Sequence, residues 1–134
     1  MKNVWKIGAR WSTTGTSQSL IIDIFKKYQI VFLGEETERF LNDVKIGDYI
    51  AIADGLIVDT LGQVIDMPKS VTNLGFDFTE EEKRRFTYED WVAGAKVNIV
   101  RLNPEDTFSC TRGAFFKAKS IHNEVIEKFN KYHI

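Results

Sequence analysis

The residues best suited to contact a ligand lie in the segment from Arg10 to Ser19, where Arg10-Trp11-Ser12 precedes a run of small and polar residues. A tryptophan at the end of a strand offers a flat π face on which one extruded base can stack. The hydroxyl of Ser12 and the backbone of the following loop could bond the edge of that base. Stacking is worth about 1–3 kcal/mol per base, comparable with burying the ring in the core, so Trp11 can be interpreted either way.

The charge of the chain is distributed unevenly, which bears on whether it could meet an anionic partner. Its 18 Lys and Arg residues are balanced by 19 Asp and Glu residues, and the formal charge of −1 excludes a polycation that binds nucleic acid indiscriminately. Residues 1–33 contain five basic residues and one acidic residue, residues 34–90 six and fourteen, and residues 91–134 seven and four. A basic surface built from both ends of the chain is therefore compatible with the total.

Four cations from these two ends are candidates for binding phosphate. They would share one surface if the first strand lies beside the segment from Cys110 to Lys119. The four are Lys6, Arg10, Arg112 and Lys117. Phosphate contacts position a nucleic acid without reading its sequence, so this surface would complement a base pocket.

The first third of the chain must supply the elements that hold these residues. Apolar and polar residues alternate over residues 4–11, which is typical of a half-buried strand. Helical spacing of apolar residues predicts a helix over residues 20–28, with Ser19 as its cap. A β-rich run predicts a strand at residues 30–33, and a short second helix is expected over residues 35–44.

The strongest local signal is a β-hairpin in the middle of the chain. Two β-rich runs, residues 49–53 and 56–65, flank the dipeptide Asp54-Gly55, which favours a tight turn. Asp54 and Gly55 would then lie at the rim of the sheet, beside the predicted base pocket. Residues 66–90 follow as a long surface excursion with aromatic residues to bury.

Two further strands and a last helix complete the predicted fold. Residues 95–102 and 108–118 are typical of strands, and Ser120 would cap the final helix. About five or six strands with about three helices, and no regular alternation of the two, indicate the α+β class: a small curved β-sheet or β-barrel flanked by helices. The length suits one domain, residues 1–134.

Two motifs carry a family resemblance. The V-K-x-G-D-x-I-x-I pattern at residues 44–52 is similar to the run that leads into a strand of EVE and ASCH domains, and W-S-T-x-G at residues 11–15 is similar to the pocket loop of YTH domains. The chain thus resembles the PUA-like superfamily over most of its length, most closely the EVE and YTH branches. The resemblance implies a small β-barrel and a modified base flipped into an aromatic cage, with Trp11 and Ser12 in the pocket loop. Trp91 is the candidate for a second cage aromatic, because it follows the long excursion and opens a strand.

The leading hypothesis is a non-enzymatic module that binds DNA or RNA carrying a modified base. Trp11 would stack on the base, Ser12 would bond its edge, and Arg10 and Arg112 would steer phosphates. If so, replacing Trp11 with Ala should abolish binding with little loss of stability. The base, the type of strand, the oligomeric state and any effector protein are left open by the sequence.

Two alternatives belong to other functional classes. A metal-assisted nuclease could use the hairpin carboxylates Asp48, Asp54 and Asp59, although turns favour Asp at two of these positions for backbone reasons. A protein-interaction module could present aromatic residues of the excursion, namely Phe76, Phe78 and Phe86. The ASCH signature, a Gly-x-Lys followed by Glu and Arg near the first strand, is absent, which argues against a ribonuclease or amidohydrolase of that kind.

The sequence also sets expectations about cofactors and location. Only Cys110, His122 and His133 are soft or imidazole metal ligands, so we expect neither a zinc site nor a cofactor. A single cysteine cannot form an internal disulfide, and the amino terminus lacks the apolar run of a secretory signal, so a cytoplasmic location is expected by default. The longest apolar runs fall well short of the roughly 18 residues of a membrane span, so no membrane partner is expected.

Overall fold

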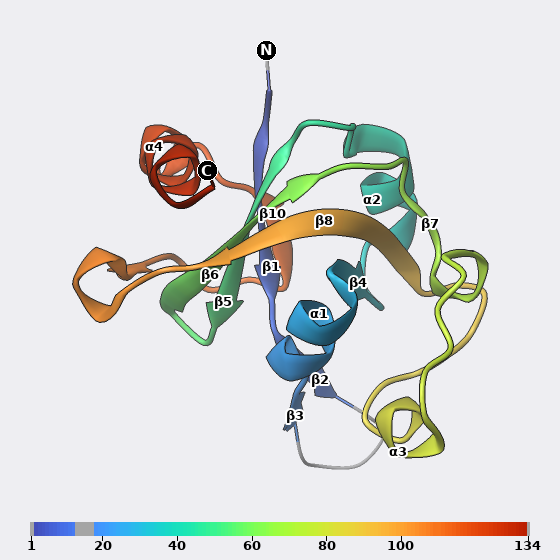
Figure 1. Ribbon diagram of the computed structural model, residues 1–134. Helices are drawn as coiled ribbons and strands as arrows, with labels where there is room; N and C mark the ends of the chain where they lie inside the picture. The colour runs from blue at the N-terminus through green and yellow to red at the C-terminus, as the bar shows by residue number, and fades with distance from the viewer. Residues whose placement is uncertain (1, 13–17, 134) are drawn as a thin grey trace.

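The computed structural model describes residues 2–12 and 18–133, and over these residues it confirms the α+β class. A curled half-barrel sheet is surrounded by helices (Figure 1). The path of hydrogen-bonded strands is β10 (Phe115–Lys117), β1 (Val4–Gly8), β5 (Tyr49–Asp54), β6 (Ile57–Val64), β8 (Ala93–Arg101) and β4 (Ile30–Leu33). The pair β1 and β5 is parallel, and the other neighbours along the path are antiparallel.

Shorter strands and the helices lie around this path. Strand β7 (Lys69–Ser70) pairs with β8, β9 (Phe108–Ser109) pairs with β6, and β2 (Arg10–Ser12) pairs with β3 (Gln18–Leu20). The α-helices of the described residues are α1 (Ile22–Tyr28), α2 (Thr37–Asp43), α3 (Glu80–Lys83) and α4 (His122–Tyr132). Two 3₁₀ turns are η1 (Val71–Asn73) and η2 (Pro104–Asp106).

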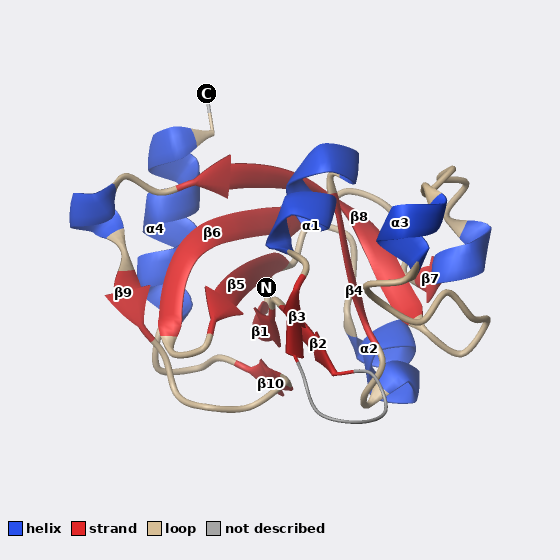
Figure 2. Cartoon of the chain, turned by 90° about the horizontal axis from the view of Figure 1, so that it is seen from below, coloured by secondary structure: helices blue, strands red, loops and turns tan. Residues whose placement is uncertain are grey.

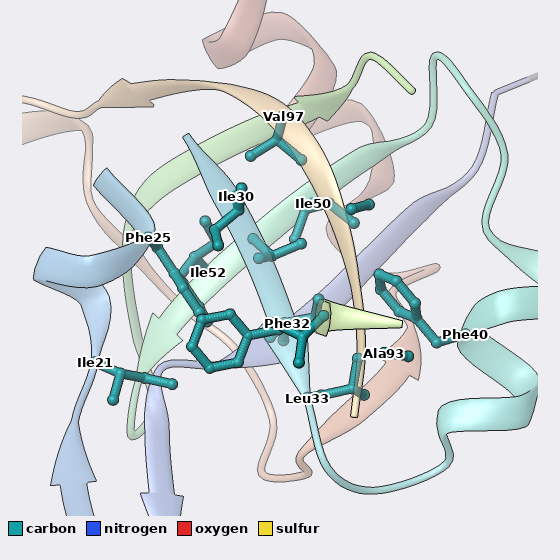
Figure 3. Packing of buried hydrophobic residues seen from close by; sticks show 14 of the residues in the cluster. Ile21, Phe25, Ile30, Phe32, Leu33, Phe40, Ile50, Ile52, Ala93 and Val97 are labelled. Atoms are coloured by element: carbon teal, nitrogen blue, oxygen red, sulfur yellow. The ribbon is translucent and has the colours of Figure 1, made fainter. Parts of the chain in front are cut away.

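The sheet has a hydrophobic core on each face, because side chains alternate along its strands. Ile50 and Ile52 of β5 face the hollow of the sheet, where they meet Phe25 of α1 and Phe32 of β4 (Figure 3). The opposite side of the same strand carries Tyr49, Ala51 and Ala53, which pack beneath α4. Figure 2 shows β5, β6 and β8 curving together, with α1 and α4 on different sides of them.

The predicted first strand is divided at Ala9. β1 stays in the main sheet, whereas β2 leaves it to pair with β3. Ala9 joins the two parts: its N–H donates to the carbonyl of Ala53 at 2.8 Å, and its own carbonyl accepts the N–H of Ile21 at 2.8 Å. The predicted apolar face continues through this break, since Trp5, Ile7, Ala9 and Trp11 are all buried in one core cluster. The prediction that the strand is half-buried is wrong for β1, because Val4 and Lys6 on its other face are also buried.

Three local predictions are wrong in detail. Ser19 lies in β3, and Ile21 precedes α1 without a side-chain cap. Ile121, not Ser120, precedes α4, again without a side-chain cap. The predicted strand over residues 108–118 is two strands, because β9 pairs with β6 while β10 pairs with β1.

The predicted hairpin is confirmed, with a small shift of its turn. The last cross-strand pair is Asp54 with Ile57, so the two-residue loop is Gly55-Leu56. Gly55 has a φ of +65°, which suits the first central position of a type II′ turn. The tip of the hairpin therefore presents Leu56, which is exposed.

The excursion over residues 66–90 is a packed part of the fold. Phe78 and Phe86 are buried in the core on the hollow side of the sheet, and Phe76 is partly buried against it. The two buried rings are thus not available as the partner surface that a protein-interaction module would need.

Glu82 of α3 attaches this excursion to α1. Its carboxylate accepts hydrogen bonds from the Tyr28 hydroxyl at 2.5 Å, from the Lys27 Nζ at 2.9 Å and from the Thr79 N–H at 2.8 Å. Burial raises the pKa of the Glu82 carboxyl, but these hydrogen bonds outweigh it and bring the pKa down to about 2. The ionised carboxylate is therefore part of the folded structure.

Replacing Glu82 with Gln is expected to lower the free energy of unfolding at pH 7 by about 2 kcal/mol, because charge-assisted hydrogen bonds are lost. The folded pKa lies below the ordinary value of 4.5, so this contribution is complete above pH 4.5 and is lost as the pH falls towards 2. Urea unfolding of both proteins between pH 7 and pH 2.5 measures it. A difference that stays constant over this range would contradict the assignment.

Candidate functional site

A cavity of about 540 Å³ lies where the end of β1 meets the tip of the β5–β6 hairpin and the loop before β10. This volume is in the range of small-molecule sites. Five parts of the chain line it. They are Lys6 with residues 8–11, residues 32–35, Ala53 with Gly55 and Leu56, Thr87 with Trp91, and residues 112–114. The site is thus assembled from segments far apart in the sequence.

The structure brings most of the predicted site residues to this cavity. Those that line it are Lys6, Arg10, Trp11, Gly55, Trp91 and Arg112. Asp54 does not line it, but its carboxylate accepts a hydrogen bond from the Nε of Arg10 at 2.7 Å. The backbone of Ser12 belongs to β2, whereas its side chain lies outside the described part of the structure.

Lys117 does not join the other cations. It lies opposite Trp5 in the antiparallel pair of β10 and β1, so the two side chains share a face of the sheet. Both line a separate hollow beside α2, together with Arg39. The grouping of Lys117 with Lys6, Arg10 and Arg112 is therefore wrong.

Trp11 forms a wall of the cavity while belonging to the core. Only 7% of the residue is exposed, and its ring centroid lies 5.9 Å from that of Phe32 and 6.3 Å from that of Phe86. The ring is packed on its core side and borders the cavity on another. The expectation that Trp11 could be removed with little loss of stability is consequently wrong.

Trp91 is the exposed aromatic of the site. It precedes β8 and is 55% exposed, the largest exposure among the large apolar side chains of the described residues. Its position at the cavity agrees with its prediction as a second aromatic. An exposed indole beside a cavity is able to stack on a planar ligand without first leaving the core.

Gly34 lies between the two indoles and was missed by the sequence analysis. A Cβ atom placed on it would be 2.7 Å from Cη2 of Trp11 and 3.3 Å from Cζ3 of Trp91. Only the absence of a side chain allows both rings to approach this position. The sequence shows a glycine closing the strand at residues 30–33, which alone does not indicate such a contact.

Replacing Gly34 with Ala is expected to destabilise the fold by about 1–3 kcal/mol, because the buried Trp11 ring cannot move aside without disturbing Phe32 and Phe86. Gly8→Ala is the matched control, since the nearest atoms would lie 4.0 Å from its Cβ. Denaturant unfolding of both variants measures the effect. Equal stabilities would show that the contact with Trp11 is not tight.

The cations of the cavity differ in their surroundings. Arg10 is partly exposed and bonds Asp54 through Nε, and no other described residue accepts a hydrogen bond from its terminal N–H groups. Arg112 is exposed and forms no ion pair with the described residues. Glu35 is the one acidic residue among those that line the cavity. The site is therefore suited to an anionic ligand.

Lys6 is the cation most removed from water. It is 3% exposed, and its Nζ donates a hydrogen bond to the carbonyl of Gly113. Burial lowers the pKa of the Lys6 ammonium, and the neighbouring thiol of Cys110 acts in the opposite direction. Burial likewise raises the pKa of the Cys110 thiol, which disfavours the reactive thiolate.

The hairpin carboxylates do not form the site that a metal-assisted nuclease would need. Asp48 is buried and accepts hydrogen bonds from the indole N–H of Trp5 and the backbone N–H groups of Asn3 and Lys45. Asp54 is paired with Arg10, as described above. Over residues 2–12 and 18–133, no three His, Cys, Asp or Glu residues are grouped so that they could hold a metal ion.

Comparisons with models of protein families and with curated proteins gave no match for this chain. Within the described ranges, none of the helices combines the length and apolar character needed to cross a bilayer.

Proposed function

We propose that this protein binds DNA or RNA by accepting one modified or extruded base into the cavity beside Trp11 and Trp91. The proposal includes membership of the PUA-like superfamily, which rests on the motifs at residues 11–15 and 44–52. The curled sheet with its flanking helices is the class of fold that the resemblance implies. No catalytic step is part of the proposal.

The observation that carries the proposal is the meeting, at one cavity, of an exposed aromatic with two arginines, of which Arg112 forms no ion pair among the described residues. Trp91 offers a ring face for stacking, and the glycine at position 34 keeps the space beside it clear. Arg112 and the terminal N–H groups of Arg10 are accessible to the phosphates on either side of an extruded base. A nucleobase in a nucleic-acid strand would use both features, because its ring can stack on Trp91 while the neighbouring phosphates contact the arginines.

Binding of fluorescently labelled oligonucleotides tests the proposal. We expect an oligonucleotide with one modified base to bind more tightly than its unmodified counterpart of identical sequence. Contacts from Arg10 and Arg112 to two phosphates should give a slope of log K against log salt of roughly −1.4 for a single strand and −1.8 for duplex DNA. If no modified or unmodified DNA or RNA binds at low salt, the proposal is wrong.

The control for the salt dependence is the double variant Arg10→Gln with Arg112→Gln. It should flatten the slope towards zero, because the two phosphate contacts are removed. Lys117→Gln removes the same kind of charge from the separate hollow beside α2 and should leave the slope unchanged. Equal flattening by Lys117→Gln would place the nucleic acid elsewhere on the protein.

A further inference from the structure

Lys6 has features that a contact with backbone phosphate does not explain. Its residue is almost wholly covered, on the side of β1 that also carries Val4, and yet it lines the cavity. Its Nζ lies 5.6 Å from the centre of the Phe116 ring. Among the described residues, no carboxylate forms an ion pair with this ammonium group.

Burying a cation without an anion costs free energy, because the cation loses its hydration and gains no counter-charge in return. The ammonium of Lys6 has three N–H donors, and the described hydrogen bonds supply one acceptor, the carbonyl of Gly113. Over residues 2–12 and 18–133, its other two donors have no acceptor from the protein. A ligand that brings a negative charge to this position would supply both the missing acceptor and the missing counter-charge.

Gly8 keeps the space in front of Lys6 open. The two residues lie on the same side of β1, because side chains alternate along a strand. A Cβ on Gly8 would lie 4.0 Å from the Nζ of Lys6, so a larger side chain there would extend into the space beside the ammonium. Both residues line the same cavity as Trp11 and Trp91.

The burial of Lys6, compared with the exposure of Arg10 and Arg112, limits which part of a ligand can reach it. A backbone phosphate is joined to two sugars and stays with the strand at the surface, where it can reach Arg112. Lys6, at 3% exposure, can be reached only by a group that itself enters the cavity. The negative charge must therefore belong to the part of the ligand that is inserted.

We propose that the inserted heterocycle carries a carboxylate and that Lys6 pairs with it. The choice of a nucleobase as this heterocycle rests on the proposed function. The ligand class is then an acid-bearing base, in which the ring stacks beside the indoles and the carboxylate accepts hydrogen bonds from the Lys6 ammonium.

The test compares three oligonucleotides of identical sequence that carry 5-carboxycytosine, 5-methylcytosine or cytosine at one position. The wild-type protein should prefer 5-carboxycytosine over 5-methylcytosine by about tenfold, the size of a charge-assisted hydrogen bond. In Lys6→Met this preference should fall to within about twofold, whereas Lys117→Met, the matched control, should retain it. Because the readout is a ratio within each protein, a change in folded fraction does not alter it.

A second variant covers the case in which Lys6→Met does not fold. Gly8→Val retains the ammonium but fills the space in front of it, so it should also remove the preference for 5-carboxycytosine. A wild-type protein without this preference, or a preference that persists in both variants, would overturn the inference.

The outcomes for the inference and for the proposed function can be told apart. If oligonucleotides with 5-methylcytosine bind and 5-carboxycytosine adds nothing, the role of Lys6 is wrong while base binding stands. If no oligonucleotide binds but free 5-carboxycytidine binds and loses affinity in Lys6→Met, nucleic-acid binding is wrong and the carboxylate site stands. If free cytidine 5′-monophosphate shows the same dependence on Lys6, the acid is a terminal phosphate and the carboxylate assignment is wrong.

Discussion

Replacing Trp11 with Ala is expected to lower the free energy of unfolding by about 3–5 kcal/mol, the cost of removing a large ring from a packed core. The ring is buried against Phe32 and Phe86, and neither of these rings can fill the space that would be left. Urea or guanidinium unfolding followed by circular dichroism measures the loss. An m-value equal to that of the wild type would show that the change lies in stability alone.

Trp11→Phe separates this packing role from any special role of indole. A smaller aromatic ring retains part of the contact with Phe32, so the expected loss is smaller than for Ala. A loss below about 1 kcal/mol for Trp11→Ala would contradict the burial seen in the structure. Binding by the Ala variant is then to be compared only under conditions in which it is fully folded.

Replacing Trp91 with Ala should leave stability almost unchanged and weaken binding. Because the side chain is 55% exposed, its removal is expected to change stability by less than about 0.5 kcal/mol. Loss of one stacking partner is worth about 1–3 kcal/mol, so the affinity for an oligonucleotide with a modified base should fall about 5- to 150-fold. Fluorescence anisotropy with the wild type and the variant at equal salt measures the fall.

Two further variants serve as controls for Trp91. Trp91→Phe retains a flat ring and should recover most of the affinity that Trp91→Ala loses. Leu56→Ala removes another exposed apolar residue that lines the same cavity, without removing a ring, and it should cost less affinity than Trp91→Ala. Unchanged binding in Trp91→Ala would mean that the base does not stack there.

Local sequence signals were sufficient for much of the fold. The strand at residues 30–33 and the hairpin depend on β propensity and on a two-residue turn, and both are confirmed. The division of the first strand at Ala9 depends instead on the carbonyl of Ala53 and the N–H of Ile21, which are distant in sequence. Alternation of apolar residues continues through Ala9 and so gives no sign of the break.

The candidate site was predicted in part, for similar reasons. The grouping of the cations was conditional on the first strand lying beside the segment from Cys110 to Lys119, and β1 does pair with β10. The register of that pair is not encoded in either strand alone, and it decides that Lys117 lies opposite Trp5 rather than beside Lys6. The burial of Trp11 depends on Phe86, which comes from the excursion, and on Gly34, which leaves room for the ring.

The most direct test of base stacking beside Trp91 uses the indole N–H signals of the three tryptophans in a ¹H–¹⁵N spectrum, assigned with Trp91→Ala and Trp11→Phe. Titration with an oligonucleotide that carries one modified base should shift the Trp91 signal most and the Trp11 signal less. The Trp5 signal should not change, because Trp5 does not line the cavity and its indole N–H donates to the carboxylate of Asp48 at 3.0 Å. Saturable binding that leaves the Trp91 signal unmoved would contradict the account.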